Sequence, residues 1–387
     1  LLAGYAYAHR LSRLPFRAQA KMHVALLAIF AIALPITLYR LPSPAPGWEV
    51  LWVPLLLVLT VGPVFFILSA QAPLMQRWYI AHPASREPWA LYAASNLGSF
   101  AGLIAYPLLA EPLLALDRQS LVWSAGYGAV ALLVAACAWT RWGAEAQRAA
   151  DPQPVAALEG PAPTARRVAL WLALSAVPSG LMLSTTTHLT TDVFAMPLLW
   201  VIPLGLYLLS FVIAFAETRR LARIITLATP VIMLSRSNGS MTLGLASVAL
   251  LFAVAVSLHA RLYDSRPAAG RLTGFYLAMS VGGALGGAFT AILAPVLFDW
   301  VWEHPLLVIA AALLMPLPAL FQWHRMDGMD TATARIVCAV LLGLAALVAW
   351  LLSDVAGGED TGAHRQFLTV ILAGIGLLLL PWRGLFV

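Results

Sequence analysis

Charged side chains are scarce in this sequence. Only 10% of its 387 residues are Asp, Glu, Lys or Arg, whereas soluble globular domains contain about 25%. Hydrophobic residues make up 61%, and the mean hydropathy is +0.85. This composition excludes an ordinary soluble domain. It predicts an all-α, multi-pass membrane protein whose main partner is the lipid bilayer.

Lysine and cysteine are almost absent. Lys21 is the single lysine, so no polybasic tract exists, and the net charge of +6 gives no reason to expect a nucleic-acid partner. Cys137 and Cys338 lie in apolar runs, which excludes a disulfide framework and indicates buried, inert thiols. No His, Cys or acidic residues pair at metal-ligand spacing on one predicted helix face. We therefore expect no metal and no cofactor.

Long apolar runs dominate the chain. Because a spanning helix needs about 20 mainly apolar residues, these runs predict helices over 1–9 (partial), 22–40, 50–73, 89–112, 119–140, 168–187, 194–216, 224–235, 241–259, 273–298, 304–321, 336–352 and 366–386. The opening "LLAGYAYAHR" resembles the second half of a helix, and we expect a further helix before residue 1.

The positions of the arginines predict the orientation. Successive loops alternate between the two sides of the membrane, and one side receives only Arg40, Arg118, Arg236 and Arg365 of the 23 basic residues. Basic residues gather in cytoplasmic loops, so the opposite side is predicted to be cytoplasmic. The segment 141–167, rich in Ala, Pro and charge, is then a cytoplasmic linker.

Two of the predicted helices repeat one another. The stretches "LYAASNLGSFAG" and "FYLAMSVGGALGG" pair Ser95 with Ser280 and Gly98 with Gly283. The glycine spacing predicts close helix packing and not a phosphate-binding loop, because it lies inside a spanning helix. Each helix holds the same place in its bundle, which is typical of parallel, major-facilitator-type halves.

The repeat and the linker together predict the domain plan. We expect major-facilitator-like 6+6 helix bundles, with the first helix missing from the chain and two extra helices at the C-terminal end. The predicted parts are an N-terminal bundle (1–140), the linker (141–167), a C-terminal bundle (168–321) and the two additional helices (322–387).

The chain resembles the membrane part of the bacterial fused major-facilitator / spermidine synthase family. The matching stretches cover most of residues 1–305 and are "LLAGYAYAHRL", "FFILSAQAPLMQRWY", "LYAASNLGSFAGLIAYPLLAEP", "LMLSTTTHLTTDVFAMPLLWVIPLGLYLLSF" and "FYLAMSVGGALGGAFTAILAPVLF". The resemblance implies a major-facilitator fold in the bacterial inner membrane. It implies no enzyme activity for this chain, because the family's synthase-like domain would follow residue 387.

The polar stretch "STTTHLTTDVFAMPLLW" (184–200) stands between two apolar runs. In it Asp192 follows His188, Thr187 and Thr191 and precedes a predicted helix. Three interpretations stay open. The polar groups cap that helix, line a water-filled cavity that binds a polar solute or a proton, or lie in an exposed outer loop.

Other polar residues give weaker signals. Glu111, near a helix end, is a further candidate contact for an ion or substrate. Ser95 and Asn96 are polar within a predicted span, where hydrogen bonds between helices are the simpler expectation. His23 and His259 fall at predicted cytoplasmic helix ends, so we expect structural roles for them.

Two functions are compatible with these features. The first is a secondary transporter of a small polar or cationic solute, with polyamine-related metabolites suggested by the resemblance. The scarcity of acids inside the spans speaks against a polycation carrier. The alternative is a non-transporting membrane anchor of a fused synthase-like domain, or a scaffold subunit of a larger membrane complex, favoured by the two extra helices.

Overall fold

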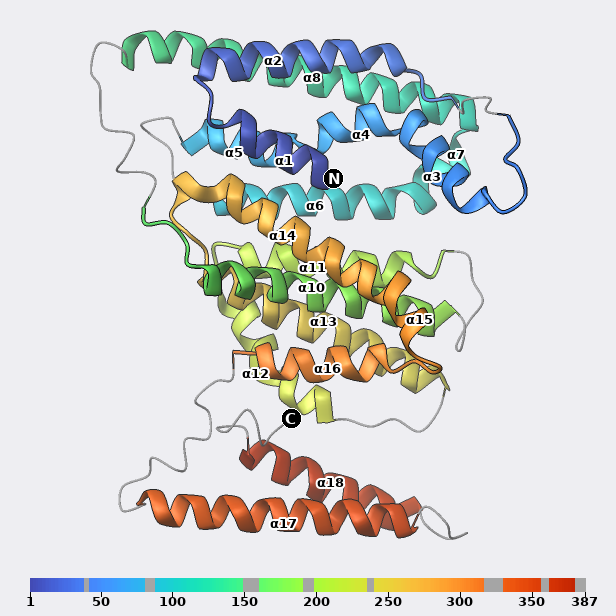
Figure 1. Cartoon of the computed structure of the whole chain (residues 1–387), viewed down its shortest axis with the longest axis vertical. Coiled ribbons are helices and arrows are strands. Elements are labelled where there is room, and N and C mark those ends of the chain that lie inside the picture. Colours follow the sequence, from blue (N-terminus) through green and yellow to red (C-terminus); the bar gives the residue numbers. More distant parts are fainter. Residues whose placement is uncertain are drawn as a thin grey trace. The chain divides into compact units, whose positions relative to one another are not determined.

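The computed structural model describes residues 1–37, 42–80, 88–148, 160–190, 198–234, 240–316, 330–355 and 362–379. Every regular element within these ranges is helical (Figure 1). The chain divides into two compact units. Unit 1 comprises Leu1–Leu172 and Arg266–Val281, and unit 2 comprises Ala173–Ser265 and Gly282–Val387. The domain limits expected from the sequence stay predictions.

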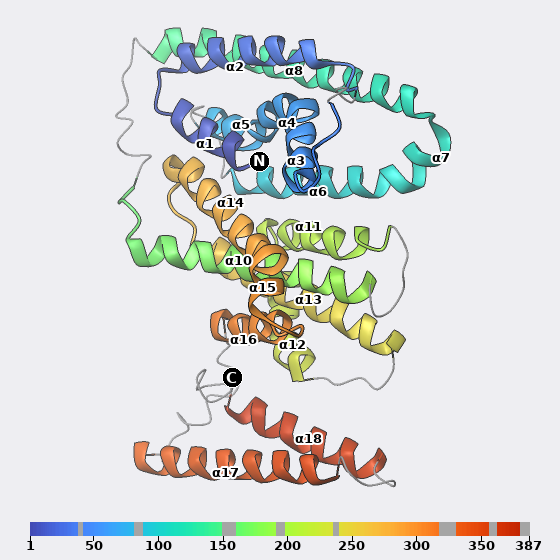
Figure 2. The same cartoon turned by 45° about the vertical axis from the view of Figure 1, so that its right-hand side comes forward.

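Unit 1 contains the helices α1 (Leu2–Leu11), α2 (Phe16–Phe30), α3 (Glu49–Thr60), α4 (Gly62–Ser69), α5 (Gln71–Ile80), α6 (Trp89–Ala105), α7 (Glu111–Leu113) and α8 (Leu116–Arg148). Helices α2 and α8 lie side by side in both views (Figures 1 and 2). The hydroxyl of Tyr127 on α8 donates a hydrogen bond of 2.7 Å to the carbonyl of Leu27 on α2. The buried core of unit 1 comes from α1, α2, α4, α5 and α8 and includes Ala8, Leu27, Ile67, Leu74 and Val134.

The remaining helices are α10 (Ala165–His188), α11 (Val201–Phe215), α12 (Arg220–Leu234), α13 (Ser240–Asp264), α14 (Leu272–Ala288), α15 (Ala294–Leu297), α16 (Glu303–Leu314), α17 (Thr331–Val355) and α18 (Gly362–Leu379). All but the first part of α10 and of α14 belong to unit 2. Helix α13 packs against α11 and α12, and Leu251, Val254, Leu258 and Leu262 are completely buried in it. Residues 253–260 of α13 are all buried, so this part of the helix lies inside the bundle of unit 2.

Helices occupy the positions of all thirteen predicted spans, but their lengths differ from the prediction. Among the described residues, six helices are long and apolar enough to cross a membrane, or seven when the bent pair Glu49–Thr60 and Gly62–Ile80 counts as one span. The all-helical, multi-pass prediction is therefore confirmed, whereas the 6+6 arrangement stays a proposal. The 64° bend of that pair coincides with Gly62 and Pro63, a combination that breaks helix hydrogen bonding.

The two repeat helices share an interruption that the sequence did not reveal. Helix α6 has 17 residues and continues into a five-residue π-helical segment, Tyr106–Ala110, and then α7. Helix α14 also has 17 residues and continues into a five-residue π-helical segment, Phe289–Leu293, and then α15. Both paths end at an extended residue, Leu114 or Phe298. The repeat therefore extends from residue type to backbone geometry.

The predicted cytoplasmic location of the segment 141–167 can be tested by cysteine labelling. Ala162 is exposed, and Ala162→Cys is expected to resist a membrane-impermeant maleimide in intact cells because of the arginine asymmetry. Cys137 is exposed, contrary to the expected burial, and Cys338 is buried, so both are first replaced by Ala. Gly160 is unsuitable, because its φ of +55° disfavours any side chain. Efficient labelling in intact cells, without opening the membrane, would contradict the orientation.

Candidate functional site

The first five residues of the polar stretch, 184–188, form the last turn of α10. With the exception of Thr185, the described hydroxyls of this stretch are accommodated within the helix, because each donates to a carbonyl about one turn earlier. Thr186 bonds to Met182 at 2.8 Å and Thr187 to Leu183 at 3.2 Å. Such back-bonding lets a hydroxyl-rich segment stay helical in an apolar environment.

Ser184 connects α10 to α16. Its Oγ lies 3.1 Å from the carbonyl of Leu181 and 2.9 Å from Nδ1 of His304. A hydroxyl carries one proton, so when Ser184 donates to the carbonyl, His304 must donate from Nδ1 and its Nε2 becomes an acceptor. His188 lies one turn after Ser184 on α10, and its side chain interacts electrostatically with the His304 ring. The site therefore brings together two imidazoles from different helices.

Thr185 is the most unusual member of this region. It is completely buried, and its Oγ1 has no hydrogen-bond partner among the described atoms. Burying an unpaired hydroxyl costs about 1–3 kcal/mol. A hydrogen bond from Thr185 to a bound solute would offset this loss of stability, which makes Thr185 a candidate binding residue. We name Ser184, Thr185, His188 and His304 the α10 polar site.

The second π-helical segment packs against the same helix. Thr290, in that segment, donates to the carbonyl of Gly180 at 3.3 Å, and Ser179 donates to the carbonyl of Gly283 at 2.9 Å. At Gly286, an added Cβ would lie 2.0 Å from the carbonyl oxygen of Ala176. These contacts hold α10 close to the interrupted span, immediately before the polar site.

The other residues singled out by the sequence are placed differently. Thr191 and Asp192 lie outside the described residues, so the capping and cavity interpretations of Asp192 stay predictions. Thr187 is exposed, although it belongs to the same helix as the polar site. Asn96 donates to the carbonyl of Tyr92 in its own helix at 2.9 Å, which differs from the expected bond between helices.

Glu111 and Ser95 are exposed in unit 1. An open groove of about 360 Å³ follows the first interruption, and its lining is Gly102, Ala105, Tyr106, Leu109, Ala110, Leu113 and Leu114. Glu111 is adjacent in sequence but does not line this groove, whose lining is apolar. The structure therefore does not bring Glu111, Ser95 or Asn96 together with one another around a shared pocket of unit 1.

Sequence reasoning missed His304 and misplaced two other histidines. His304 is a lone histidine near a helix start, and its only signal is the position of an ionisable residue beside an apolar run. His23 and His259 lie inside helices that extend beyond the predicted ends. Helix α2 begins at Phe16 and α13 ends at Asp264, which places both imidazoles within candidate spans.

Within the described ranges, no three His, Cys, Asp or Glu side chains gather closely enough to hold a metal ion. The α10 polar site offers hydroxyl oxygens and imidazole nitrogens, which suit hydrogen bonding to a polar solute. The chain matches none of the family models, curated proteins or solved structures with which it was compared.

Proposed function

We propose that this chain is a secondary transporter of a small polar or cationic solute in the bacterial inner membrane, and that the solute contacts the α10 polar site. The observation that carries the proposal is the matched interruption of α6 and α14. Interrupted spans at corresponding positions of two repeats are the best indicator of a transporter binding site.

Each interruption combines a π-helical segment with a proline, Pro107 in the first and Pro295 directly after the second. A π segment and a proline both leave backbone groups without their usual helical partner. Inside a membrane, such groups persist only where protein or a polar cavity satisfies them. Thr290 lies in the second interruption and contacts α10 four residues before Ser184, which supports solute binding at this level of the helix.

The chemistry of the site favours a hydrogen-bond donor as solute. An ammonium group is such a donor, and hydroxyl oxygens and imidazole Nε2 atoms accept from it. Amines related to polyamines are the class suggested by the family resemblance. None of the site's described members is a carboxylate, so we propose a small amine in preference to a highly charged polycation.

A substitution at Thr185 separates binding from folding. Thr185→Val is expected to keep or raise the melting temperature, because it removes an unpaired buried hydroxyl and retains the side-chain shape. It is expected to lower uptake of radiolabelled putrescine by proteoliposomes about tenfold, the effect of losing one hydrogen bond to a charged solute. Spermidine serves as the second probe, and empty liposomes give the background.

Thr226→Val is the matched control. Thr226 is also a buried threonine in a helix, but its hydroxyl donates to the carbonyl of Ala222 at 2.8 Å. The control is expected to lose about 1 kcal/mol of stability and to retain uptake. Uptake of both amines at the background level by folded wild-type protein, or uptake unchanged in Thr185→Val, would count against the proposal.

The scaffold function keeps one specific observation in its favour. Helices α17 and α18 form a separate apolar core with Cys338, Val348, Ile375 and Leu379. This hairpin is additional to the proposed 6+6 plan, and Val340 on α17 is 55% exposed. A stable complex with another membrane subunit, seen by native mass spectrometry together with absent uptake, would favour the scaffold.

A further inference from the structure

His23 lies well inside a membrane-length helix. The sequence predicted a helix starting at 22, but α2 begins at Phe16, directly after Pro15, whose fixed φ favours a helix start. His23 is therefore about two turns inside the candidate span Phe16–Ala33, and its side chain is completely buried. An ionisable residue in such a place is a functional hypothesis by default.

Two neighbouring helices provide partners for the ring. The hydroxyl of Tyr7 on α1 lies 3.3 Å from Nδ1 of His23, and the two rings stack at 5.8 Å. Gln71 on α5 lies within interaction distance of His23. The amide nitrogen of Gln71 donates to the carbonyl of Ile67 at 3.2 Å, so its Oε1 is the end left to the imidazole.

The remaining polar atom of each side chain is unsatisfied. His23 Nε2 and Gln71 Oε1 are buried, and neither forms a hydrogen bond of normal geometry with the described residues. One is a nitrogen that can carry a proton, and the other is an acceptor only. A small approach of the two side chains would complete a bond from Nε2–H to Oε1.

We propose that His23 is a reversible proton-binding site, with Tyr7 and Gln71 as its two hydrogen-bond partners. In the neutral ring, Tyr7 donates its hydroxyl proton to Nδ1, and Nε2–H points to Gln71 Oε1. Upon protonation, Nδ1–H donates to the Tyr7 oxygen, and the hydroxyl proton turns away. Both states keep an acceptor for every ring N–H, which is the condition for burying an imidazolium.

The charged groups on the surrounding helices are directed elsewhere. Arg17 and Lys21 lie over the Trp142 ring, and Arg141 lies over Phe16. The other titratable or charged side chains described on the packed helices α1, α5 and α8 are Tyr5, His9, Arg10, Arg77, Tyr79, Asp117, Arg118, Tyr127 and Cys137. Of these, His9 bonds to Thr273 and Arg77 to the carbonyl of Gly270. Helix α4 contributes no titratable side chain.

His259 is also a buried histidine, but its hydrogen bonds leave no acceptor for a second ring proton. The hydroxyl of Ser210 donates to the carbonyl of Tyr207 at 2.6 Å, so His259 must donate from Nδ1 to Ser210, across 2.8 Å. Its Nε2 is then a bare acceptor, buried and without a partner among the described atoms. A proton there would create a buried N–H with no acceptor. His259 is expected to stay neutral, and it provides the control within the same protein.

Proton binding at His23 does not depend on the transport activity proposed above. Coupling of this proton to solute movement would be a further role of His23, and that role rests on the proposed function. A spectroscopic test of protonation therefore separates the two proposals. Absence of uptake would overturn the transport function but not proton binding at His23, and absence of titration would overturn proton binding but not transport.

The test is nitrogen NMR of the full chain, labelled with ¹⁵N-histidine and held in lipid nanodiscs. The eight histidines give separate ring signals, and His23→Gln and His259→Gln assign two of them. The expected result is an Nε2–H tautomer for His23 at high pH, changing to the doubly protonated ring as the pH is lowered over the range in which the protein stays folded. The expected result for His259 is an Nδ1–H tautomer throughout.

Two substitutions at Gln71 distinguish proton binding from a structural role. Gln71→Leu removes the Nε2–H acceptor and is expected to lower the proton affinity of His23 about tenfold, whereas Gln71→Glu is expected to raise it. Opposite shifts support the site and also assign the His23 signal should His23→Gln fail to accumulate. A His23 ring that stays neutral down to pH ~4.5 in folded protein, or shifts in the same direction in both variants, overturns the proposal.

Discussion

Gly286→Ala is expected to destabilise the protein by about 3 kcal/mol and to reduce the yield of folded chain, whereas Gly287→Ala is expected to have little effect. A Cβ at position 286 would lie 2.0 Å from the carbonyl oxygen of Ala176, 2.8 Å from its carbonyl carbon and 3.0 Å from its Cα. These are backbone atoms of α10, which cannot rotate away. Overpacking of a close contact usually costs about 1–3 kcal/mol, and backbone contact places this case at the upper end.

Gly287 is the adjacent residue on the same helix. A Cβ there would lie 3.5 Å from the end of the Leu183 side chain, an ordinary contact. Helix propensity changes equally in both variants, so their difference in melting temperature, followed by tryptophan fluorescence in detergent, isolates the close approach. Equal melting temperatures for the two variants would contradict the packing of α10 on α14.

The glycine pattern predicted close helix packing but not which helices pack together. Small-xxx-small spacing predicted close packing in both repeat helices, and the prediction is confirmed at Gly286. At Gly98 and Gly102, however, no atom of unit 1 lies within 4 Å of an added Cβ. The spacing shows that a helix can approach another closely, but the identity of the packing partner depends on tertiary contacts far apart in sequence.

Helix positions were predictable because an apolar run of membrane length is visible in composition alone. Helix starts were less so, since Pro15 moved the start of α2 ahead of the apolar run and thereby placed His23 inside the span. The hydrogen bond between Ser184 and His304 joins residues 120 positions apart, and no local pattern encodes it. Pro107 and Pro295 indicate kinks at these two places, but the five-residue π-helical geometry has no recognisable residue pattern.

Some arginines predicted to be cytoplasmic have a second role, which the distribution of basic residues along the sequence does not indicate. Arg141 donates to the carbonyl of Trp78 near the end of α5, and Arg261 donates to the carbonyl of Leu314 at the end of α16. The C-terminal end of a helix leaves its last carbonyls without partners and carries a partial negative charge. A guanidinium there donates hydrogen bonds to the carbonyls and also offsets the charge. These arginines therefore hold helix ends together, in addition to their predicted cytoplasmic location.

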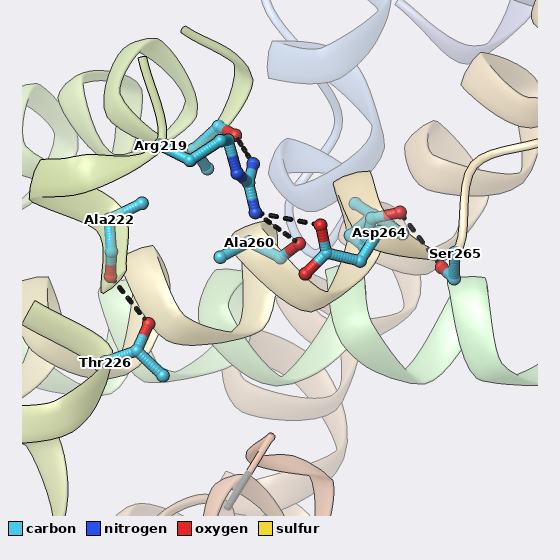
Figure 3. Close-up of polar contacts among 8 residues, drawn as sticks. Arg219, Ala222, Thr226, Ala260, Asp264 and Ser265 are labelled. Atoms are coloured by element: carbon cyan, nitrogen blue, oxygen red, sulfur yellow. Dashed lines mark hydrogen bonds and ion pairs between the residues drawn. The ribbon is translucent and has the colours of Figure 1, made fainter. Parts of the chain in front are cut away.

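Arg219 is the most extensive example (Figure 3). It follows α11, donates to the carbonyl of Ala214 in that helix, and reaches the carbonyl of Ala260 on α13 at 3.2 Å. The same guanidinium forms an ion pair of 3.0 Å with Asp264 and lies 4.2 Å from the Tyr263 ring centroid. One side chain thus joins the ends of α11 and α13.

We expect Arg219→Ala to destabilise unit 2 by about 3 kcal/mol, because two helix-end carbonyls and a carboxylate lose their donor together. Arg219→Lys is expected to recover less than half of this, since an ammonium lacks the planar fork that reaches several acceptors. Asp264→Asn is expected to cost less than about 1 kcal/mol, because the Asp264 side chain is 64% exposed and water screens the ion pair. The measurement is the melting temperature in detergent at low and high salt.

The contrast between Arg219→Ala and Asp264→Asn decides what the arginine does. If the ion pair dominated, the two variants would lose similar stability, and high salt would reduce the wild-type advantage. If the carbonyl bonds dominate, as we expect, Arg219→Ala is far more harmful and the loss is nearly independent of salt. Arg220→Ala is the control, because Arg220 is adjacent and exposed, and its removal changes the net charge equally. A loss at Arg220 as large as that at Arg219 would reduce the effect to net charge alone.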